Sequence, residues 1–149
     1  MKRDYGTSME RLLWGGAKLT EVEFGLLESL VTALPPALRT IVEAQFEAYN
    51  LAQREVDGRA LNFYRKTKGG KVDDMGGLPL LSMEVIEAPL VRLKASVVGE
   101  TMPVHATLNA VKGCVFSLAL DRPVAAEGKV IVVDVTKAWR SNFRFKDTD

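Results

Sequence analysis

His105 and Cys114 are the chain's one histidine and one cysteine, and this scarcity limits the chemistry it can support. A zinc site of the usual kind needs more Cys and His ligands than these two. A nucleophilic triad built on His105 needs a hydroxyl and an orienting acid. Ser96 and Ser117 share its expected side of a sheet, but neither lies in a nucleophile-elbow motif. The sequence leaves an enzymatic role open, favours a non-catalytic one, and indicates no metal and no cofactor.

A basic loop is the second chemical feature. Glycines beside lysines can wrap an anion with backbone N–H groups, and the run 65–71 contains both without any acid. The spacing of a P-loop is absent, and Asp73 and Asp74 partly cancel the charge. An ordinary surface loop over 66–77 is therefore the competing interpretation. The candidate contacts with an anion or a partner in this run are Arg65, Lys66, Lys68 and Lys71.

The C-terminal tail, residues 137–149, interleaves aromatic and basic side chains. Such a composition can stack on nucleic-acid bases and hold phosphates. It can equally bury its aromatics against the domain while its bases remain in water. The chain carries 20 basic and 19 acidic residues, and this balance favours burial because nucleic-acid binders usually have a basic excess. The candidate contacts in the tail are Trp139, Arg140, Phe143 and Arg144.

Capping signals and apolar spacing predict the helices that precede these segments. Thr20 and Glu23 form a capping box, and apolar residues at helical spacing follow it. Pro35-Pro36 ends that stretch, and Pro36 suits the first turn of a second helix. Residues 1–19 are expected to be a loosely ordered N-terminal segment with a helical turn. The predicted helical segments are 9–14, about 21–33 and about 36–49.

Alternation of apolar and polar residues predicts a run of strands in the second half of the chain. Asp57-Gly58 separates two further extended runs and is a strong signal for a two-residue hairpin turn. Pro89 and Pro103 indicate edge positions or strand starts. The predicted strands are 51–56, 59–65, 79–86, 91–97, 102–110, 114–120 and 129–135.

The register of the central three strands follows from pairing apolar with apolar residues. A two-residue turn at Gly99-Glu100 pairs Val97 with Met102 and places both on the buried face. A three-residue loop at 111–113 then places Cys114 and Phe116 on the buried face as well. A two-residue turn at Lys112-Gly113 is rejected, because it would pair inward residues with outward ones, and such register slips are strongly disfavoured.

The opposite face of this sheet is polar. In the predicted register Lys94 lies opposite His105, Arg92 lies opposite Thr107, and Ser117 is next to Thr107. Arg92 and His105 would then be placed to receive an anionic group, although antiparallel sheets often simply face water on one side. The candidate binding face consists of Arg92, Lys94, His105, Thr107, Asn109 and Ser117.

Helices followed by antiparallel strands are typical of an α+β domain. We therefore expect one domain over 1–149, with two N-terminal helices packed on one face of an antiparallel, largely meander sheet of about 5–7 strands. A single cysteine excludes an intramolecular disulfide and indicates a reducing, cytoplasmic location. The chain shows neither a signal region nor an apolar membrane span.

Three functions remain in contention. The leading hypothesis is a non-catalytic binding or regulatory domain that acts through a protein partner, such as an inhibitor or accessory protein. The first alternative is a small-ligand binder or enzyme that uses the face around Arg92 and His105. Nucleic-acid binding through 65–71 and 137–146 is possible but not favoured by the balanced charge. No membrane partner is expected, and the Val-rich strand 130–135 allows a homodimer by edge pairing.

Overall fold

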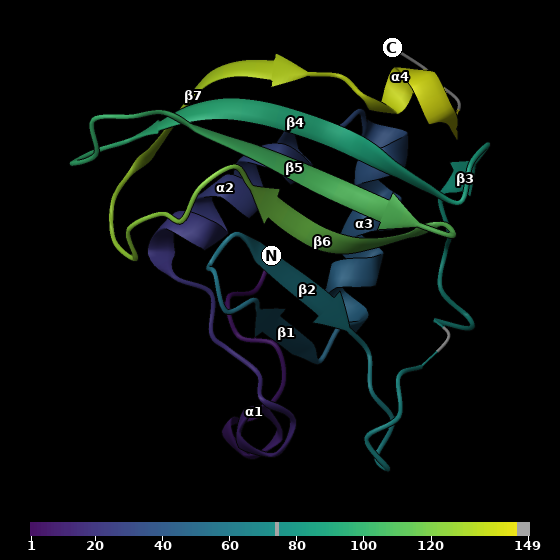
Figure 1. Ribbon diagram of the computed structural model, residues 1–149. Helices are drawn as coiled ribbons and strands as arrows, with labels where there is room; N and C mark the ends of the chain where they lie inside the picture. Colours follow the sequence, from purple (N-terminus) through teal and green to yellow (C-terminus); the bar gives the residue numbers. More distant parts are fainter. Residues whose placement is uncertain (74, 146–149) are drawn as a thin grey trace.

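The computed structural model describes residues 1–73 and 75–145, and shows a curved antiparallel sheet backed by helices (Figure 1). The helices are α1 (Ser8–Trp14), α2 (Glu21–Thr32), α3 (Pro36–Ala48) and α4 (Trp139–Asn142). The strands are β1 (Leu51–Arg54), β2 (Ala60–Tyr64), β3 (Ser82–Met83), β4 (Glu87–Val97), β5 (Val104–Val111), β6 (Cys114–Leu120), β7 (Val130–Thr136) and β8 (Phe143–Arg144). The α+β prediction is confirmed. None of the described helices is long and apolar enough to cross a membrane.

The helices begin and end where the sequence predicts. The Thr20 hydroxyl accepts from the Glu23 amide at 3.1 Å, and the Glu23 carboxylate accepts from the Thr20 amide at 2.9 Å. Pro36 starts α3, where its missing N–H leaves no helical bond unmade. The helical turn predicted near residue 9 is a complete helix, α1, because Thr7 and Glu10 form a second capping box.

Six strands form the main sheet in the order β1-β2-β6-β5-β4-β7, and β3 and β8 form a separate two-stranded ribbon. The predicted meander β4-β5-β6 is confirmed, including the pairing of Ala95 with Val104. Met102, predicted to be buried, is 65% exposed because β5 begins only at Val104. The expected strand 79–86 contracts to the two residues of β3.

The turn between β5 and β6 corrects the predicted register. Val111 pairs with Cys114, so the turn has two residues, Lys112 and Gly113, with φ angles of 49° and 86°. Both central residues of a type I′ turn need positive φ. A register shift on β6 makes Phe116 the extra, bulged residue, and the bulge restores apolar pairing further along the strand. Cys114 and Phe116 are consequently half-buried and lie outside the buried sheet face.

The hairpin between β1 and β2 forms as predicted, but its turn is longer. The Glu55 amide donates to the Ala60 carbonyl at 2.9 Å, which closes the loop. Only Gly58 has a positive φ, 72°, whereas the predicted two-residue turn would also need one at Asp57. The Asp57 carboxylate instead accepts from the Arg59 amide at 3.0 Å, so its side chain stabilises the loop.

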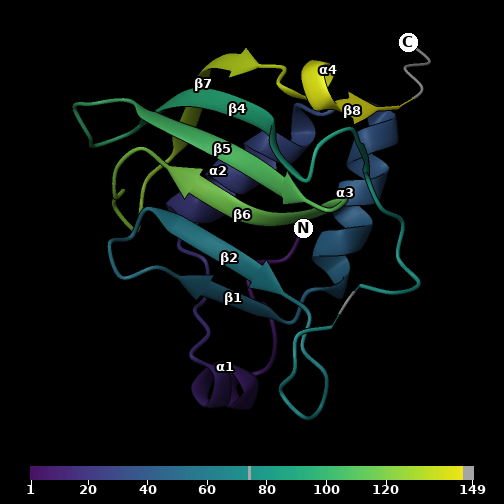
Figure 2. The same cartoon turned by 45° about the vertical axis from the view of Figure 1, so that its right-hand side comes forward.

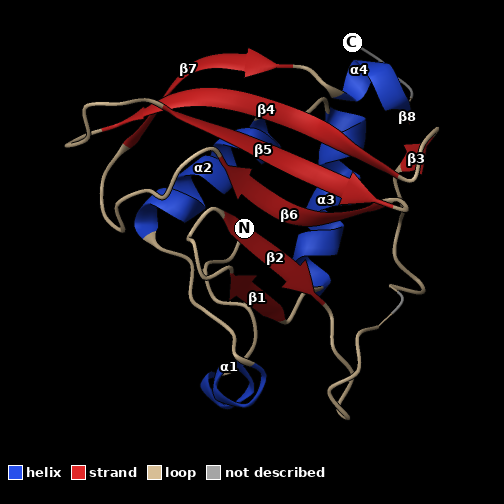
Figure 3. Cartoon of the chain, in the orientation of Figure 1, coloured by secondary structure: helices blue, strands red, loops and turns tan. Residues whose placement is uncertain are grey.

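Helices α2 and α3 lie behind the sheet in both views, and no described helix covers its other face (Figure 2, Figure 3). An aromatic cluster fills the layer between α3 and β2, with Phe46 and Phe63 packed edge to face at 5.0 Å between ring centroids. Glu23 is 4% exposed and needs a partner there, which Arg54 of β1 provides through its Nε at 2.8 Å. Helix and sheet are thus joined by both apolar packing and a charge pair.

A buried amide connects α3 to the β5–β6 turn. Gln45 has no exposed surface. Its amide nitrogen donates to the carbonyls of Pro79 and Gly113, both at 2.9 Å, and its oxygen accepts from the Val115 amide at 2.9 Å. Every strong hydrogen-bonding position of this side chain except one oxygen lone pair is therefore used.

We expect Gln45→Leu to lower the free energy of unfolding by about 3 kcal/mol, because it leaves one buried N–H and two carbonyls without these partners. Urea denaturation measures the change. Glu43→Leu places the same side chain at an exposed position of α3, and its effect should stay within about 0.5 kcal/mol. Equal effects of the two substitutions would contradict a structural role for the Gln45 amide.

Acid is expected to weaken the fold partly through Glu100. The Ala125 amide donates to its carboxylate at 2.8 Å; this bond and the Arg122 guanidinium hold the pKa of Glu100 below its ordinary value, although desolvation opposes the shift. A carboxyl group whose pKa is lowered on folding stabilises the protein above its unfolded pKa, and this contribution is lost as the pH falls through the folded pKa.

Glu100→Gln should therefore reduce the loss of stability between about pH 5 and pH 3, as measured by urea midpoints across that range. Glu127→Gln is the control, since Glu127 is exposed and forms no ion pair with any residue that the structure describes. An unchanged acid profile in Glu100→Gln would show that other carboxylates govern acid unfolding.

Candidate functional site

The exposed residues of the predicted polar face alternate along β4 and β5 with the buried residues of the core, so they lie on the other side of the sheet from the core. Figure 1 shows α2 and α3 behind the sheet, on one side only. Arg92 pairs with Thr107 and Lys94 pairs with His105, as predicted. Ser117 differs, because the bulge in β6 places it opposite Asn109 and leaves it only 6% exposed. Asn109 and Thr107 are half-buried, so the accessible part of this face is mainly the basic ladder on β4 and the start of β5.

Asp121 is the partner of His105, and the sequence reasoning did not pair them. The Asp121 carboxylate accepts from the His105 amide and contacts the ring Nδ1, each at 2.9 Å. Burial alone would raise the pKa of Asp121, but the hydrogen bonds from the His105 amide and ring lower it overall. No hydroxyl or thiol of the described residues hydrogen-bonds the His105 ring, so a triad is not assembled here.

The aromatic side chains of the tail belong to the core. Trp139 is 4% exposed and Phe143 is 7% exposed. Of the two arrangements considered for the tail, the structure therefore has the one in which these aromatic side chains are buried. Arg140 and Arg144 stay at the surface, and Arg144 pairs with Glu84 at 3.0 Å. Residues 146–149 lie outside the described residues.

The two basic segments lie at opposite ends of the molecule. In both views α4 is at the top, whereas the loop after β2 is at the bottom, beside α1 (Figure 1, Figure 2). The described parts of 65–71 and 137–146 therefore do not form one continuous surface.

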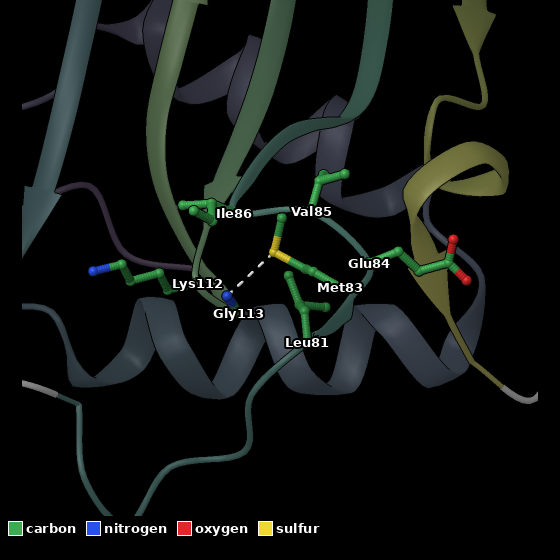
Figure 4. Close-up of a pocket in the computed structure, with 7 residues that line it drawn as sticks. All are labelled: Leu81, Met83, Glu84, Val85, Ile86, Lys112 and Gly113. Carbon is green, nitrogen blue, oxygen red and sulfur yellow. Dashed lines mark hydrogen bonds between the residues drawn. The ribbon is translucent and has the colours of Figure 1, made fainter.

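A shallow depression of about 400 Å³ lies beside the β5–β6 turn (Figure 4). Its wall is the segment Leu81–Ile86, and the Gly113 amide donates to the Met83 sulfur at 3.2 Å. Glu84 points outward (Figure 4), so the depression gathers no converging polar side chains. It is less suited to a specific ligand than the cavity on the other side of the same turn.

The basic loop forms one wall of that second cavity. The Arg65 guanidinium donates to the Asp73 carboxylate at 2.9 Å and to the Gly76 carbonyl at 3.1 Å. Lys66 pairs with Val72 in an isolated bridge, which closes the loop on itself. The basic side chains of the loop thus have different environments. Arg65 is hydrogen-bonded within the loop, whereas Lys68 and Lys71 are exposed.

The cavity measures about 370 Å³ and opens between the loop, the end of β2 and the start of β6. Cys114, predicted to be an enclosed core residue, is half-buried in its wall. Desolvation raises the pKa of its thiol, and nearby Arg65 only partly opposes the shift. The full lining is Tyr49, Phe63, Tyr64, Arg65, Val72, Asp73, Met75, Val111, Lys112, Cys114 and Phe116.

Helix α1 carries an apolar face that no other described element covers. Met9, Leu12 and Leu13 are 63%, 80% and 69% exposed, and α1 buries none of its residues. Their spacing of i, i+3 and i+4 puts them on one side of the helix. This surface was not among the predicted sites, although the sequence contains two signals for it, the Thr7–Glu10 capping box and the apolar spacing.

The edge strand β7 carries exposed apolar residues as well. Ile131, Val132 and Val133 are all exposed, and Val133 is the extra residue of a bulge opposite β4. Lys129 and Lys137 flank the strand. Bulges and flanking lysines are common devices against pairing with another strand, so this edge is a weaker contact surface than α1.

The comparisons with known proteins do not assign a function. No model of a known protein family, no curated protein and no solved structure matches the chain.

Proposed function

We propose that this domain is a non-catalytic binding module that inserts the apolar face of α1 into a hydrophobic groove of a partner protein. The observation that carries this proposal is the exposure of Met9, Leu12 and Leu13 on one side of a capped helix. Burying a large aliphatic side chain is worth about 1.5–3 kcal/mol, so three such groups provide a useful part of a binding free energy. Helix-in-groove recognition uses this spacing of anchors.

The attachment of α1 to the domain supports the same proposal. Gln53 of β1 donates to the Trp14 carbonyl at 2.8 Å, and the Lys66 ammonium lies 5.5 Å from the centre of the Trp14 ring. The helix is therefore held at its C-terminal end while its apolar face points away. A helix that is folded before binding loses less conformational entropy when it docks.

The neighbouring charges indicate the chemistry of the partner. Lys66 touches Trp14, and Lys68 and Lys71 are exposed in the same loop without an ion pair to any described residue. Acidic side chains at the rim of the partner's groove would complement them. A membrane surface suits α1 less well, because interfacial helices carry a basic polar face and α1 offers one arginine and one glutamate.

The proposal is tested by the double substitution Leu12→Ser/Leu13→Ser. Tagged protein would be used to isolate a partner from an extract of its source organism, and the identified partner would be purified for titration calorimetry. We expect the double variant to weaken binding by at least about tenfold, since each tenfold step corresponds to about 1.4 kcal/mol. Its urea midpoint should barely change, because these side chains bury little surface in the free domain.

Val98→Ser provides the control, as Val98 is also an exposed aliphatic residue, at 57%, and lies in the turn between β4 and β5. Equal affinity of the Leu12/Leu13 double variant and the parent protein would overturn the proposal. Cosedimentation with anionic phosphatidylserine vesicles that depends on Leu12 and Leu13, in the absence of a protein partner, would also overturn it in favour of a membrane surface. Nuclease-sensitive capture would identify nucleic acid as the ligand.

A further inference from the structure

We propose that the cavity between the basic loop and the β2–β6 strands binds a small monocarboxylate with an apolar body, and that Arg65 and Lys112 receive its carboxylate. This site is separate from the exposed face of α1, because no residue of α1 lines the cavity. The inference therefore does not depend on the proposed protein partner.

The walls of the cavity suit an apolar body. Four aromatic rings, those of Tyr49, Phe63, Tyr64 and Phe116, line it together with aliphatic side chains. The Tyr49 hydroxyl donates to the Val115 carbonyl, so it is already satisfied and presents mainly ring surface. A volume of about 370 Å³ lies near the small end of the range of about 300–1,000 Å³ for ligand sites.

The charged residues that line the cavity have a net charge of one positive unit, which favours an anionic ligand. These residues are Arg65, Asp73 and Lys112, which leave one positive charge uncompensated at neutral pH. Asp73 pairs with Arg65 at 2.9 Å, whereas Lys112 forms no ion pair with any described residue. A ligand with a single carboxylate would balance the set, and a neutral apolar ligand would leave Lys112 without a counter-ion.

The Nε of Arg65 is a hydrogen-bond donor without an acceptor among the described residues. The Arg65 Nη2 donates to Asp73 and Gly76, whereas the Nε is buried. Because this Nε has almost no exposed surface, a carboxylate oxygen would reach it only after the Arg65 side chain turns toward the cavity, and the carboxylate would then supply the missing acceptor. The uncompensated positive charge of the lining is the reason to expect a carboxylate rather than a purely apolar occupant.

Lys112 is fixed at the cavity by the backbone of the turn. Its φ of 49° is uncommon for a lysine, and its amide donates to the Ile86 carbonyl at 2.8 Å. In Figure 4 its side chain extends away from Met83 and Val85, out of the shallow depression. Asparagine adopts positive φ more readily than lysine, so the conformation alone does not account for a lysine here.

Cys114 is a built-in reporter for occupancy. It is the chain's single cysteine and lies half-buried in the cavity wall. The probes are decanoate, 1-naphthoate and the uncharged decanol. Binding would be measured by titration calorimetry and by the rate at which N-ethylmaleimide alkylates Cys114, followed by mass spectrometry. We expect a saturating carboxylate to slow alkylation at least about threefold, because an occupied cavity covers the thiol.

The decisive variant is Lys112→Asn, which removes the charge and keeps a residue that favours a type I′ turn. It should weaken carboxylate binding about tenfold, the scale of one charge-assisted contact, and leave the urea midpoint unchanged or higher. Lys68→Asn makes the same charge change in the basic loop but outside the cavity lining, so its affinity should match that of the parent protein.

The outcomes separate the parts of the inference. Binding of decanoate alone identifies an aliphatic ligand, binding of 1-naphthoate alone identifies an aromatic one, and either supports the proposal. Failure of both carboxylates to bind or to protect Cys114 at millimolar concentration would overturn it. So would equal binding of decanol and decanoate, or unchanged affinity in Lys112→Asn. The Leu12→Ser/Leu13→Ser protein should retain carboxylate binding, which keeps this test independent of the partner protein.

Discussion

The hydrogen bonds that hold the Val115 backbone to α3 and Tyr49 are the constraint on which the rest of this fold depends. The Val115 amide donates to Gln45 at 2.9 Å, and its carbonyl accepts from the hydroxyl of Tyr49, one helical turn later. Both backbone polar groups of a β6 residue are thus satisfied by side chains of α3 and of Tyr49, the residue that caps its C-terminus. Because Gln45 also holds the Gly113 carbonyl, the helix fixes the turn and the first residues of β6 together.

This anchoring accounts for the bulge and for the cavity. The pairing of β2 with β6 stops at Asn62 and Ser117, and the bulge at Phe116 lies between this point and the residue that α3 holds. The start of β6 therefore follows the helix while β2 runs on to the basic loop. The divergence of the two strands leaves the aromatic-lined space that the loop closes from outside. Gly113 is needed here, because a Cβ at that position would lie 2.9 Å from the Leu81 carbonyl oxygen.

The elements that depend on local patterns are predictable from the sequence. The capping box at Thr20, the proline at Pro36 and the alternation in β4 and β5 each act within a few residues, and the predicted helices and meander follow from them. The register of β6 is not local. It depends on a hydrogen bond between Val115 and Gln45, which are 70 residues apart. The pattern of apolar and polar residues within the strand cannot predict that bond.

The candidate surfaces show the same division. The positions of Arg92 and Lys94 on one face could be predicted, because alternation along the strand determines them. The pairing of Lys94 with His105 could be predicted from the register of the meander. The cavity was not visible, since it requires a bulge and a loop that returns to the sheet. The apolar face of α1 lies between these cases. Its spacing is local, but its exposure depends on where the domain places the helix.

The basic loop joins the two proposed binding functions in one physical element. Lys66 contacts Trp14 at the root of α1, while Val72 and Met75 line the cavity on the loop's other side. The ion pair between Arg65 and Asp73 joins the two ends of the loop and so holds its α1-facing side and its cavity-facing side together. Gly70 contributes to this arrangement, since its positive φ of 80° lets the backbone approach the Trp14 ring, where a Cβ would come within 3.3 Å of the indole nitrogen. Lys66 and Gly70 are therefore explained by their packing against Trp14, and they do not require a phosphate-binding role.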